Sequence, residues 1–308
     1  MKGIVCVNNK FVPSDKARIS VFDKGLQYGD GMFETMRAYR GRIFLFEEHM
    51  ERLANGARIL RITPPQAKII KKNALRVLKE NNLLSSDAYL KIMLTAGNSG
   101  EKPASPRLIR AGTWIIISRE LDVRGISLTQ KNGITAITLR GWTNPFGAIK
   151  SLSYMRSVLG KIEADNRGAF EAIFMTPEGY ILEGASTNVF LVKNKILKTP
   201  GIGKAARRPV LSGIEWVGRA TPDNSAILRG VTRDAVIRLA RDKGLRVKET
   251  RINVKDLETC DEAFVTNSIM EITPLKKVDS IKIKTGPITA LLLAAYKELA
   301  RRRFTLPT

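Results

Sequence analysis

One lysine at the end of an apolar segment constrains this chain more than any other feature. Lys150 follows Phe146-Gly147-Ala148-Ile149, and these flanks predict that its side chain is buried. Burial disfavours the ammonium form, so it lowers the pKa of a lysine. A lysine with a lowered pKa is the side chain that ordinarily forms a Schiff base with a carbonyl compound. The sequence therefore predicts that Lys150 is a nucleophile.

A carboxylate lies in a second apolar segment. Glu183 interrupts residues 180–192, whose composition predicts one continuous β-strand. An unpaired buried charge costs several kcal/mol, on the order of the desolvation of any ion. We therefore expect Glu183 to have a partner in the folded protein.

The length of the chain predicts two domains. A chain of 308 residues exceeds the usual size of one hydrophobic core, and 44% hydrophobic residues is ordinary for a folded protein. The expected domains are residues 1–122 and residues 123–308. No segment approaches the ~20 apolar residues of a membrane span. The protein is therefore expected to have no membrane partner and to be cytoplasmic.

The supply of metal-binding and imidazole side chains is small. The chain has one histidine, His49, and two cysteines, Cys6 and Cys260, which lie far apart in the sequence. These numbers exclude a multi-histidine metal site, a disulfide framework and a cysteine zinc site, so no metal is expected. His49 lies in a segment with helical spacing, which favours a structural role over a catalytic one.

The net charge of +23, with a pI near 10.2, suggests a polyanion partner. A nucleic-acid-binding protein is therefore the alternative from another function class. The basic residues are scattered over nearly every segment, without a basic helix or a strand with interleaved aromatic residues. We expect no specific nucleic-acid partner.

Local patterns in the first domain predict an α+β arrangement. The pair Asn8-Asn9 favours positive φ and predicts a hairpin between two short strands. Further strands are expected at residues 32–39, 89–95 and 113–118. Two helices are expected at residues 47–60 and 65–82.

The second domain begins with a strand-rich segment, residues 125–140, and continues with a helix over residues 153–167. A β-meander is expected over residues 171–176, 180–192 and 195–197. A helix opens at Gly230 and closes at Lys243-Gly244, and the chain ends with a helix over residues 287–303.

Three glycine- or hydroxyl-rich segments are candidate ligand sites. Backbone amides at the opening of the helix after Gly230, with the Thr232 hydroxyl, suit a phosphate, and so does Thr266-Asn267-Ser268. Each of these two segments has a plainer interpretation as a helix cap or turn. Residues 25–31 contain three glycines and lie beside aromatic strand residues, a pattern equally typical of a pocket and of a glycine-rich turn.

Six segments, in order along the chain, resemble the fold-type IV (class IV) pyridoxal-phosphate enzymes. This family includes branched-chain aminotransferases, D-amino-acid aminotransferases and aminodeoxychorismate lyases. The resemblance covers almost the whole chain and implies a smaller N-terminal α/β sandwich and a larger C-terminal pseudo-barrel. The segments are residues 28–37 (YGDGMFETMR), 49–53 (HMERL), 150–154 (KSLSY), 182–190 (LEGASTNVF), 230–233 (GVTR) and 266–274 (TNSIMEITP).

The resemblance implies pyridoxal 5'-phosphate as the cofactor and assigns roles to residues. Lys150 would form the Schiff base and move a proton between the substrate Cα and the cofactor C4′. Glu183 would pair with the pyridine nitrogen, and Tyr154 would hydrogen-bond the ring phenolate. The phosphate would be held by Arg52, the backbone at Val231, the Thr232 hydroxyl and Ser268.

The family pattern also implies a homodimer whose pocket receives a loop from the other subunit. The substrate pocket would be lined by Tyr28, Phe33, Arg37, Tyr89, Lys91 and Ile269. The resulting hypothesis is transamination of a small amino acid, with a branched-chain donor favoured, and with 2-oxoglutarate or a similar keto acid as acceptor. A D-amino-acid aminotransferase and an aminodeoxychorismate lyase are the enzyme alternatives.

The chain departs from the family pattern in three places. Two of them are substrate-binding signatures, and the third is an insertion. Branched-chain members usually carry Tyr-x-Arg where this chain has Tyr89-Leu90-Lys91. D-amino-acid members carry Arg-x-His where this chain has Arg107 followed by Ile109. A basic insertion of roughly twenty residues, about residues 199–220, has no counterpart in the family pattern.

Overall fold

The computed structural model describes residues 3–98, 110–144, 146–202 and 227–302. The chain divides into two compact units. Unit 1 is Met1–Asp122 together with Ile149–Tyr154, and unit 2 is Val123–Ala148 together with Met155–Thr308. The short segment around Lys150 therefore belongs by its packing to the first unit, although it follows a strand of the second unit in sequence.

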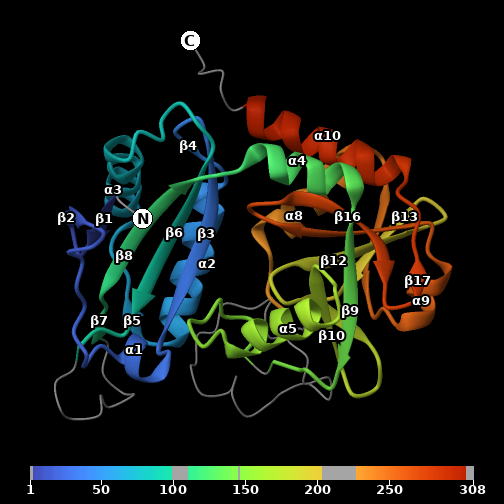
Figure 1. Cartoon of the computed structure of the whole chain (residues 1–308), viewed down its shortest axis with the longest axis horizontal. Helices are drawn as coiled ribbons and strands as arrows, with labels where there is room; N and C mark the ends of the chain where they lie inside the picture. The colour runs from blue at the N-terminus through green and yellow to red at the C-terminus, as the bar shows by residue number, and fades with distance from the viewer. Residues whose placement is uncertain (1–2, 99–109, 145, 203–226, 303–308) are drawn as a thin grey trace. The chain divides into compact units, whose positions relative to one another are not determined.

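Unit 1 is built on a six-stranded sheet with the order β2-β1-β8-β6-β3-β4, in which neighbouring strands are antiparallel. Three helices complete the described part of the unit, and α2 and α3 pack on the sheet (Figure 1). The strands are β1 (Ile4–Val7), β2 (Lys10–Pro13), β3 (Gly31–Tyr39), β4 (Arg42–Ile43), β6 (Ala88–Thr95) and β8 (Trp114–Glu120), with a separate parallel pair, β5 (Ile62–Thr63) and β7 (Arg110–Ala111). The helices are α1 (Lys24–Tyr28), α2 (Phe46–Ile59) and α3 (Ala67–Glu80).

Strict alternation in β6 explains how this sheet has two different faces. Leu90, Ile92 and Leu94 are fully buried in the core of unit 1, whereas Tyr89 and Lys91, between them, are half-buried. Successive side chains of a strand point to opposite faces, so Tyr89 and Lys91 share the face opposite the core. The predicted hairpin at the start of the chain is confirmed, because Asn8 and Asn9 have φ of 47° and 67° between β1 and β2.

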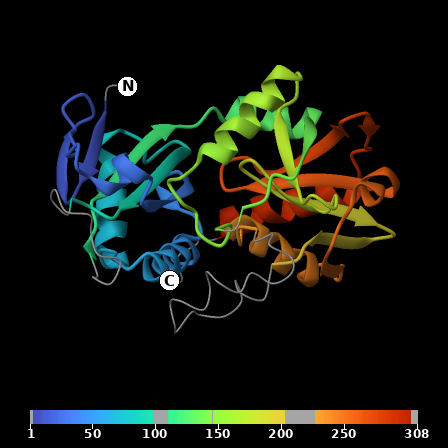
Figure 2. The same cartoon turned by 90° about the horizontal axis from the view of Figure 1, so that it is seen from below.

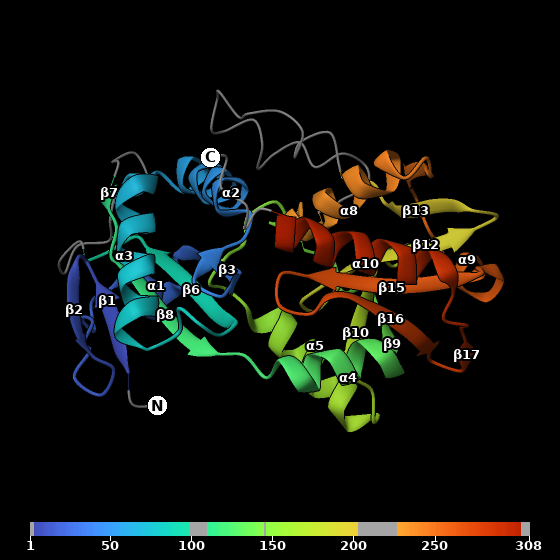
Figure 3. The same cartoon turned by 90° about the horizontal axis from the view of Figure 1, so that it is seen from above.

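Unit 2 contains a mixed nine-stranded sheet with the order β11-β10-β9-β16-β15-β12-β13-β14, and β17 pairs with β16. Helix α10 runs along β15 and β16 (Figure 3), and α8 packs on β14 and β15. In Figure 2, α5 is the yellow-green helix, which packs on β9 and β10. The strands are β9 (Ile134–Arg140), β10 (Glu171–Met175), β11 (Ile181–Gly184), β12 (Asn188–Lys193), β13 (Ile196–Pro200), β14 (Arg246–Thr250), β15 (Glu262–Asn267), β16 (Glu271–Val278) and β17 (Ile281–Lys282). The helices are α4 (Val123–Asn132), α5 (Met155–Asn166), α8 (Val231–Asp242), α9 (Val254–Thr259) and α10 (Pro287–Arg302).

The expected α+β fold class is confirmed, but two local predictions in unit 2 are wrong. Residues 125–140 were expected to be strand-rich, and their first half forms α4, which ends before Gly133 at φ 66°. Most residues of this helix are exposed, and Gln130 is its buried residue. One contact fixes its end, because the buried Gln130 side chain donates to Met270 O at 2.8 Å and to Glu271 at 3.0 Å.

The predicted single strand over residues 180–192 is two strands, β11 and β12, which are not neighbours in the sheet. The break occurs at Ser186 and Thr187, whose hydroxyls donate to the buried carboxylate of Glu171 at 3.1 and 3.2 Å. Gly184 lies against this turn, where an added Cβ would be 2.0 Å from the Thr187 hydroxyl. The expected meander is therefore replaced by two separate hairpins, β10-β11 and β12-β13.

In the part of the chain that the structure describes, no helix combines the length and the apolar character needed to cross a membrane.

Candidate active site

The segment that carries Lys150 is held by the backbone of β3. Phe33 N donates to Lys150 O at 2.9 Å, and Leu152 N donates to Gly31 O at 3.0 Å. Ile149, the preceding residue, is 7% exposed and is part of the core of unit 1. The buried isoleucine and the two backbone bonds fix the position from which the Lys150 side chain extends.

Three residues predicted to form the site, Lys150, Lys91 and Tyr154, meet around the ring of a fourth, Phe33. The Nζ atoms of Lys150 and Lys91 lie 4.6 and 4.4 Å from its centroid. The ring of Tyr154 meets it edge-on, at 5.4 Å between centroids and 81° between planes. Burial lowers the pKa of the Lys91 ammonium group. Both amines are half-buried, so the expected burial of Lys150 is only partial.

The remaining predicted substrate residues of unit 1 are Tyr28, Arg37 and Tyr89. The contacts described for Arg37 and Tyr89 are with residues outside this cluster. Arg37 pairs across β3 and β6 with Tyr89, but its guanidinium is buried against Asp87, with Nη2 2.7 Å from Oδ2. A cation next to the Tyr89 ring is supplied by Arg119, 4.6 Å from its centroid. Tyr28 ends α1 and is 67% exposed.

Arg52 belongs to a buried ionic cluster in unit 1. Its Nε and Nη2 donate to the two carboxylate oxygens of Glu34 at 2.8 and 2.6 Å, which fixes the plane of the guanidinium. His49 Nδ1 lies 2.6 Å from Glu34 Oε2, and His49 and Glu34 are 2% and 1% exposed. The single histidine therefore has the structural role that its sequence context favoured.

The same cluster shifts two pKa values. Burial alone would raise the pKa of Glu34, but the charge and hydrogen bonds of Arg52, followed by those of His49, lower it to about 2. Burial lowers the pKa of His49; Glu34 opposes this shift, while the charges of Arg52 and Lys150 add to it. Glu34 is therefore an anion, and His49 is neutral at pH 7.

We expect acid to destabilise the protein through this cluster in two stages. The unfolded chain binds a proton at its histidine near pH 6.5, before the folded protein does, so stability falls below that pH. Glu34 contributes stability that is present above pH 4.5 and lost between pH 4.5 and about 2. That second contribution is about 3 kcal/mol.

Urea unfolding measured from pH 8 to pH 4.5 tests the first stage. His49→Gln removes the titrating imidazole, so the free energy of unfolding of this variant should depend less on pH between 6.5 and 4.5 than that of the wild type. Equal slopes in that range would contradict the assignment.

Glu183, in unit 2, has both carboxylate oxygens engaged. Oε2 accepts from Leu228 N at 2.9 Å, and Oε1 lies 3.4 Å from Nη2 of Arg156. The side chains of Glu183 and Arg156 are 12% and 19% exposed. The partner that the sequence required is therefore an arginine in the first turn of α5, which sequence reasoning did not identify.

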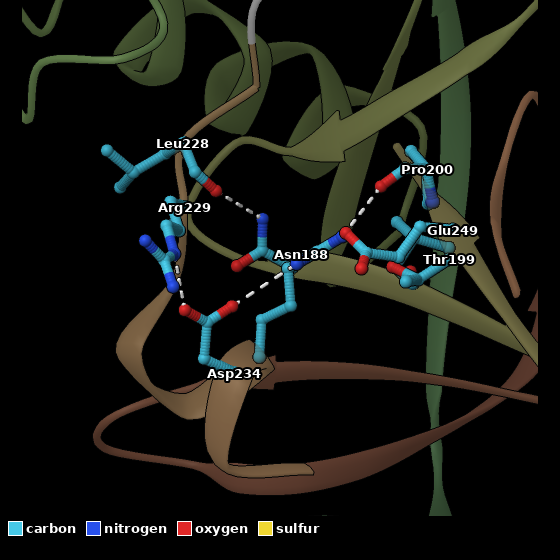
Figure 4. A network of polar contacts seen from close by, with 9 residues as sticks. Asn188, Thr199, Pro200, Leu228, Arg229, Asp234 and Glu249 are labelled. Atoms are coloured by element: carbon cyan, nitrogen blue, oxygen red, sulfur yellow. Dashed lines mark hydrogen bonds and ion pairs between the residues drawn. The ribbon is translucent and has the colours of Figure 1, made fainter. Parts of the chain in front are cut away.

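The start of α8 carries two of the predicted phosphate ligands. Val231 and Thr232 are buried, and the N-cap residue, Gly230, has no side chain to cap the first-turn amides. Asn188 fixes the preceding loop by donating to Leu228 O at 3.0 Å (Figure 4). A Cβ on Gly230 would lie 2.0 Å from the Asn188 side-chain oxygen, so only glycine allows this close approach.

A buried arginine fastens α8 to the sheet. Arg233 is 1% exposed, and its guanidinium binds Pro200 O at 2.9 Å, Glu249 at 3.0 Å and Asp234 at 3.3 Å. Asp234 also accepts from Arg229 at 2.6 Å (Figure 4). These contacts join α8 to the end of β13 and to β14. Arg233 and Asn188 therefore position the helix opening. Sequence reasoning did not assign this role, although both residues lie in the segments that resemble the family.

Ser268 and Ile269 lie in the turn between β15 and β16, where both are half-buried. Asn267 shapes this turn, because its side-chain oxygen accepts from Ile269 N at 3.0 Å and Met270 N at 2.7 Å. Thr266, the residue before it, is 2% exposed, and its hydroxyl has no hydrogen-bond partner within the described ranges. Thr266 pairs in the sheet with Asn188, next to the opening of α8.

The predicted site residues thus form separate groups in the two units. Lys150, Tyr154, Phe33, Lys91 and Arg52 belong to unit 1, and Glu183 and the four residues at the α8 opening and the β15-β16 turn belong to unit 2. Arg107 and Ile109, and all but the first few residues of the 199–220 insertion, lie outside the described residues. Within the described ranges, no group of three or more His, Cys, Asp or Glu side chains is placed to hold a metal ion.

Comparison with known proteins identifies the family. The family model for amino-transferase class IV matches residues 31–215 and 219–278, which is most of the chain. The chain belongs to the class IV aminotransferases. It is 36% identical over 303 residues to a putative branched-chain-amino-acid aminotransferase of Methanocaldococcus jannaschii, covering 96% of each chain. It is 30% identical over 298 residues to a D-alanine aminotransferase of Listeria monocytogenes, covering 96% of this chain and 95% of that one.

The fold agrees with solved branched-chain amino acid aminotransferase structures. The enzyme from Escherichia coli superposes with a TM-score of 0.78 at 28% identity, covering 97% of this chain and 94% of that chain. Another such enzyme, solved in complex with N-(5'-phosphopyridoxyl)-L-glutamate, superposes with a TM-score of 0.81 at 28% identity. The cofactor of class IV aminotransferases is pyridoxal 5'-phosphate. The expected family, fold, enzyme class and cofactor are therefore confirmed.

The residues of unit 2 fit the phosphate of this cofactor. The opening of the twelve-residue helix α8 has no side-chain cap and carries the Thr232 hydroxyl. It lies beside the buried hydroxyl of Thr266, which is unsatisfied among the residues that the structure describes. Uncapped first-turn amides and hydroxyl donors are the groups that bind a phosphate.

Proposed function

We propose that this class IV aminotransferase transfers the amino group of a small, branched-chain L-amino acid to 2-oxoglutarate or a similar keto acid. The observation that carries the proposal is the cluster of Lys150, Phe33, Tyr154 and Lys91, in which an apolar ring adjoins two amines. An apolar wall suits a hydrocarbon side chain, and a cation suits a carboxylate. The similarity to a putative branched-chain-amino-acid aminotransferase of Methanocaldococcus jannaschii supports the same assignment.

The proposed roles follow from the chemistry of each side chain. When bound, pyridoxal phosphate supplies a carbonyl group and an electron sink for the substrate carbanion. Lys150 is the nucleophile and moves the substrate Cα proton. Glu183 holds a proton at the ring nitrogen, and Tyr154 donates a hydrogen bond to the ring phenolate.

Phosphate-binding roles are proposed for residues of each unit separately. In unit 2, Val231 N, the Thr232 hydroxyl and Ser268 would bind the phosphate oxygens. In unit 1, Arg52 would supply the positive charge, in the orientation fixed by its two hydrogen bonds to Glu34.

Substrate selection is proposed for the face of the unit 1 sheet opposite the core. Phe33 would contact the substrate side chain, and Lys91 would orient a carboxylate as a point charge, without the bidentate grip of an arginine. Tyr28, Tyr89 and Arg37 would line the surrounding pocket in unit 1. Ile269 is proposed as a substrate residue of unit 2. Because a lysine selects less sharply than an arginine, we expect weaker discrimination among donors than in an enzyme with Tyr-x-Arg at residues 89–91.

A panel of amino donors tests the substrate assignment. The holoenzyme is mixed with single L- or D-amino acids, and conversion of bound pyridoxal phosphate to pyridoxamine phosphate is followed by absorbance. L-leucine, L-isoleucine and L-valine are the expected donors. Conversion by D-alanine but not by L-leucine would favour the D-amino-acid alternative. Release of pyruvate from aminodeoxychorismate, with no conversion by either donor, would favour the lyase.

We also propose that the enzyme is a homodimer. Helix α5 exposes an apolar stripe at helical spacing: Met155, Val158, Leu159 and Ile162 are 66%, 45%, 45% and 49% exposed. Apolar helix faces are normally covered, and a second copy of the chain is the cover proposed for this one. Light scattering on the holoenzyme, which gives its molar mass in solution, tests this proposal.

A further inference from the structure

Arg156 is an unusual neighbour for a carboxylate that is expected to serve a cofactor ring. Its Nη2 lies 3.4 Å from Glu183 Oε1, and both side chains are less than a fifth exposed. At this distance, an arginine stabilises the charged form of a carboxylate. The same positive charge opposes a second cation that approaches that carboxylate.

The packing of α5 holds the Arg156 guanidinium in place. The guanidinium lies 3.9 Å from the centroid of Phe174, whose ring is stacked on Trp142 at 5.7 Å and 5°. Helix α5 approaches Phe174 closely because of Gly160, where an added Cβ would be 2.7 Å from the ring. Arg156 is therefore fixed from one side by an aromatic stack and from the other by Glu183.

The Glu183 carboxylate is also held by two contacts. Glu183 Oε2 accepts from Leu228 N at 2.9 Å, so the group has one oxygen on the backbone and the other beside Arg156. Each carboxylate oxygen has two lone pairs, which leaves acceptor capacity for a further donor. Glu183 can therefore accept from a protonated ring nitrogen while it keeps its contacts with Leu228 and Arg156.

Other charges near β11 are already balanced within unit 2. Strand β10 carries Glu171, and strands β12 and β13 carry Lys193 and Lys198. Each of these has an oppositely charged partner: Lys161 for Glu171 at 3.0 Å, Asp261 for Lys193 at 3.5 Å, and Asp256 for Lys198 at 3.1 Å. Arg156, in contrast, is in direct contact with Glu183.

We infer that Arg156 is a positioning residue for Glu183. Arg156 holds the Glu183 carboxylate in place, and its positive charge makes the cofactor ring nitrogen beside Glu183 bind its proton less strongly. The inference rests on the proposed role of Glu183. Two effects of the Arg156 charge both disfavour the protonated ring nitrogen. Arg156 repels a protonated ring, and it partly neutralises the negative charge of the Glu183 carboxylate. Removing the charge should therefore make the ring nitrogen keep its proton to a higher pH.

The experiment is a pH titration of holoenzyme loaded with pyridoxal phosphate that is ¹⁵N-labelled in the ring. The ¹⁵N chemical shift reports directly whether the ring nitrogen is protonated. In Arg156→Met, which keeps the side-chain stem over Phe174, the midpoint should lie about one pH unit or more above that of the wild type. In Arg156→Lys, which keeps the charge, it should stay closer to the wild-type value. Arg156→Gln is a second neutral variant and should behave as Arg156→Met.

Arg167→Met is the matched control. Arg167 follows α5 directly, is 54% exposed and pairs with Glu163, so its loss makes the same change in net charge far from the contact with Glu183. Its midpoint should equal that of the wild type. A general effect of net charge, with equal shifts in Arg156→Met and Arg167→Met, would overturn the inference. A midpoint in Arg156→Met at or below the wild-type value, or a nitrogen that stays equally protonated to about pH 10 in both proteins, would also overturn it.

The Glu183→Gln variant separates failure of this inference from failure of the proposed function. If the ring nitrogen of Glu183→Gln titrates as in the wild type, Glu183 does not hold that proton, and the proposed role of Glu183 fails. If Glu183→Gln changes the titration and Arg156→Met does not, only the inference about Arg156 fails.

Discussion

Replacing Lys150 with alanine should abolish amino transfer and covalent attachment of the cofactor. The amine is the proposed nucleophile and proton carrier, and positioned acid–base catalysis alone contributes about 10²- to 10⁴-fold. We expect a loss of at least about 10³-fold in the rate of amino transfer. The fold should survive, because the backbone bonds of the segment to β3 and the burial of Ile149 do not involve the replaced side chain.

Borohydride reduction followed by peptide mapping gives the sharpest measurement of this change. In the wild type, the reduced cofactor should be found on Lys150, and in Lys150→Ala on no peptide. Lys68→Ala, at an exposed position of α3, is the control for loss of one lysine and should behave as the wild type. Recovery of the cofactor on Lys91, the second amine beside Phe33, would show that the two lysines have been assigned the wrong roles.

The helices and the first hairpin follow from local patterns in the sequence. Helices α2, α3, α8 and α10 lie where spacing and end signals placed them, because each buries one face against its own unit. Helix α4 was mistaken for a strand because its sides are mostly exposed. Its end is fixed by Gln130, which bonds to Met270 and Glu271 at a sequence separation of 140 and 141 residues.

The candidate site shows the same limit of sequence reasoning. The sequence could indicate that Glu183 needs a partner, since the cost of a buried charge is local information. It could not indicate Arg156, 27 residues away, because their contact depends on how closely α5 packs against β10. Likewise, Ser186 and Thr187 break the strand only because Glu171 lies across from them in the folded unit.

The ionic cluster of Arg52 could not be predicted from spacing either. Glu34 and Arg52 lie on different elements, β3 and α2, and they meet because α2 packs on β3. The signal available in the sequence was Glu34 itself, a charged residue on an otherwise apolar face of β3. Residues 32–38 carry Met32, Met36 and Ala38 on the same face, all buried, so an acid among them required a cation.

Replacing Glu183 with glutamine should have the second largest effect and a different signature. An amide keeps an acceptor for Leu228 N but has no negative charge, so it cannot hold a proton at the ring nitrogen. Loss of a preorganised electrostatic contact of this kind costs about 10²- to 10³-fold in rate, which is the reduction expected for amino transfer. Covalent attachment to Lys150 should persist, so borohydride reduction distinguishes this variant from Lys150→Ala.

The matched variant is Glu183→Asp, which keeps the charge on a shorter side chain. Its rate should lie between those of the wild type and Glu183→Gln if charge is the decisive property. Glu183→Gln also leaves the mostly buried Arg156 facing a neutral amide, so its thermal stability must be measured beside its rate. A properly folded Glu183→Gln enzyme that transfers amino groups at the wild-type rate would refute the role of this carboxylate.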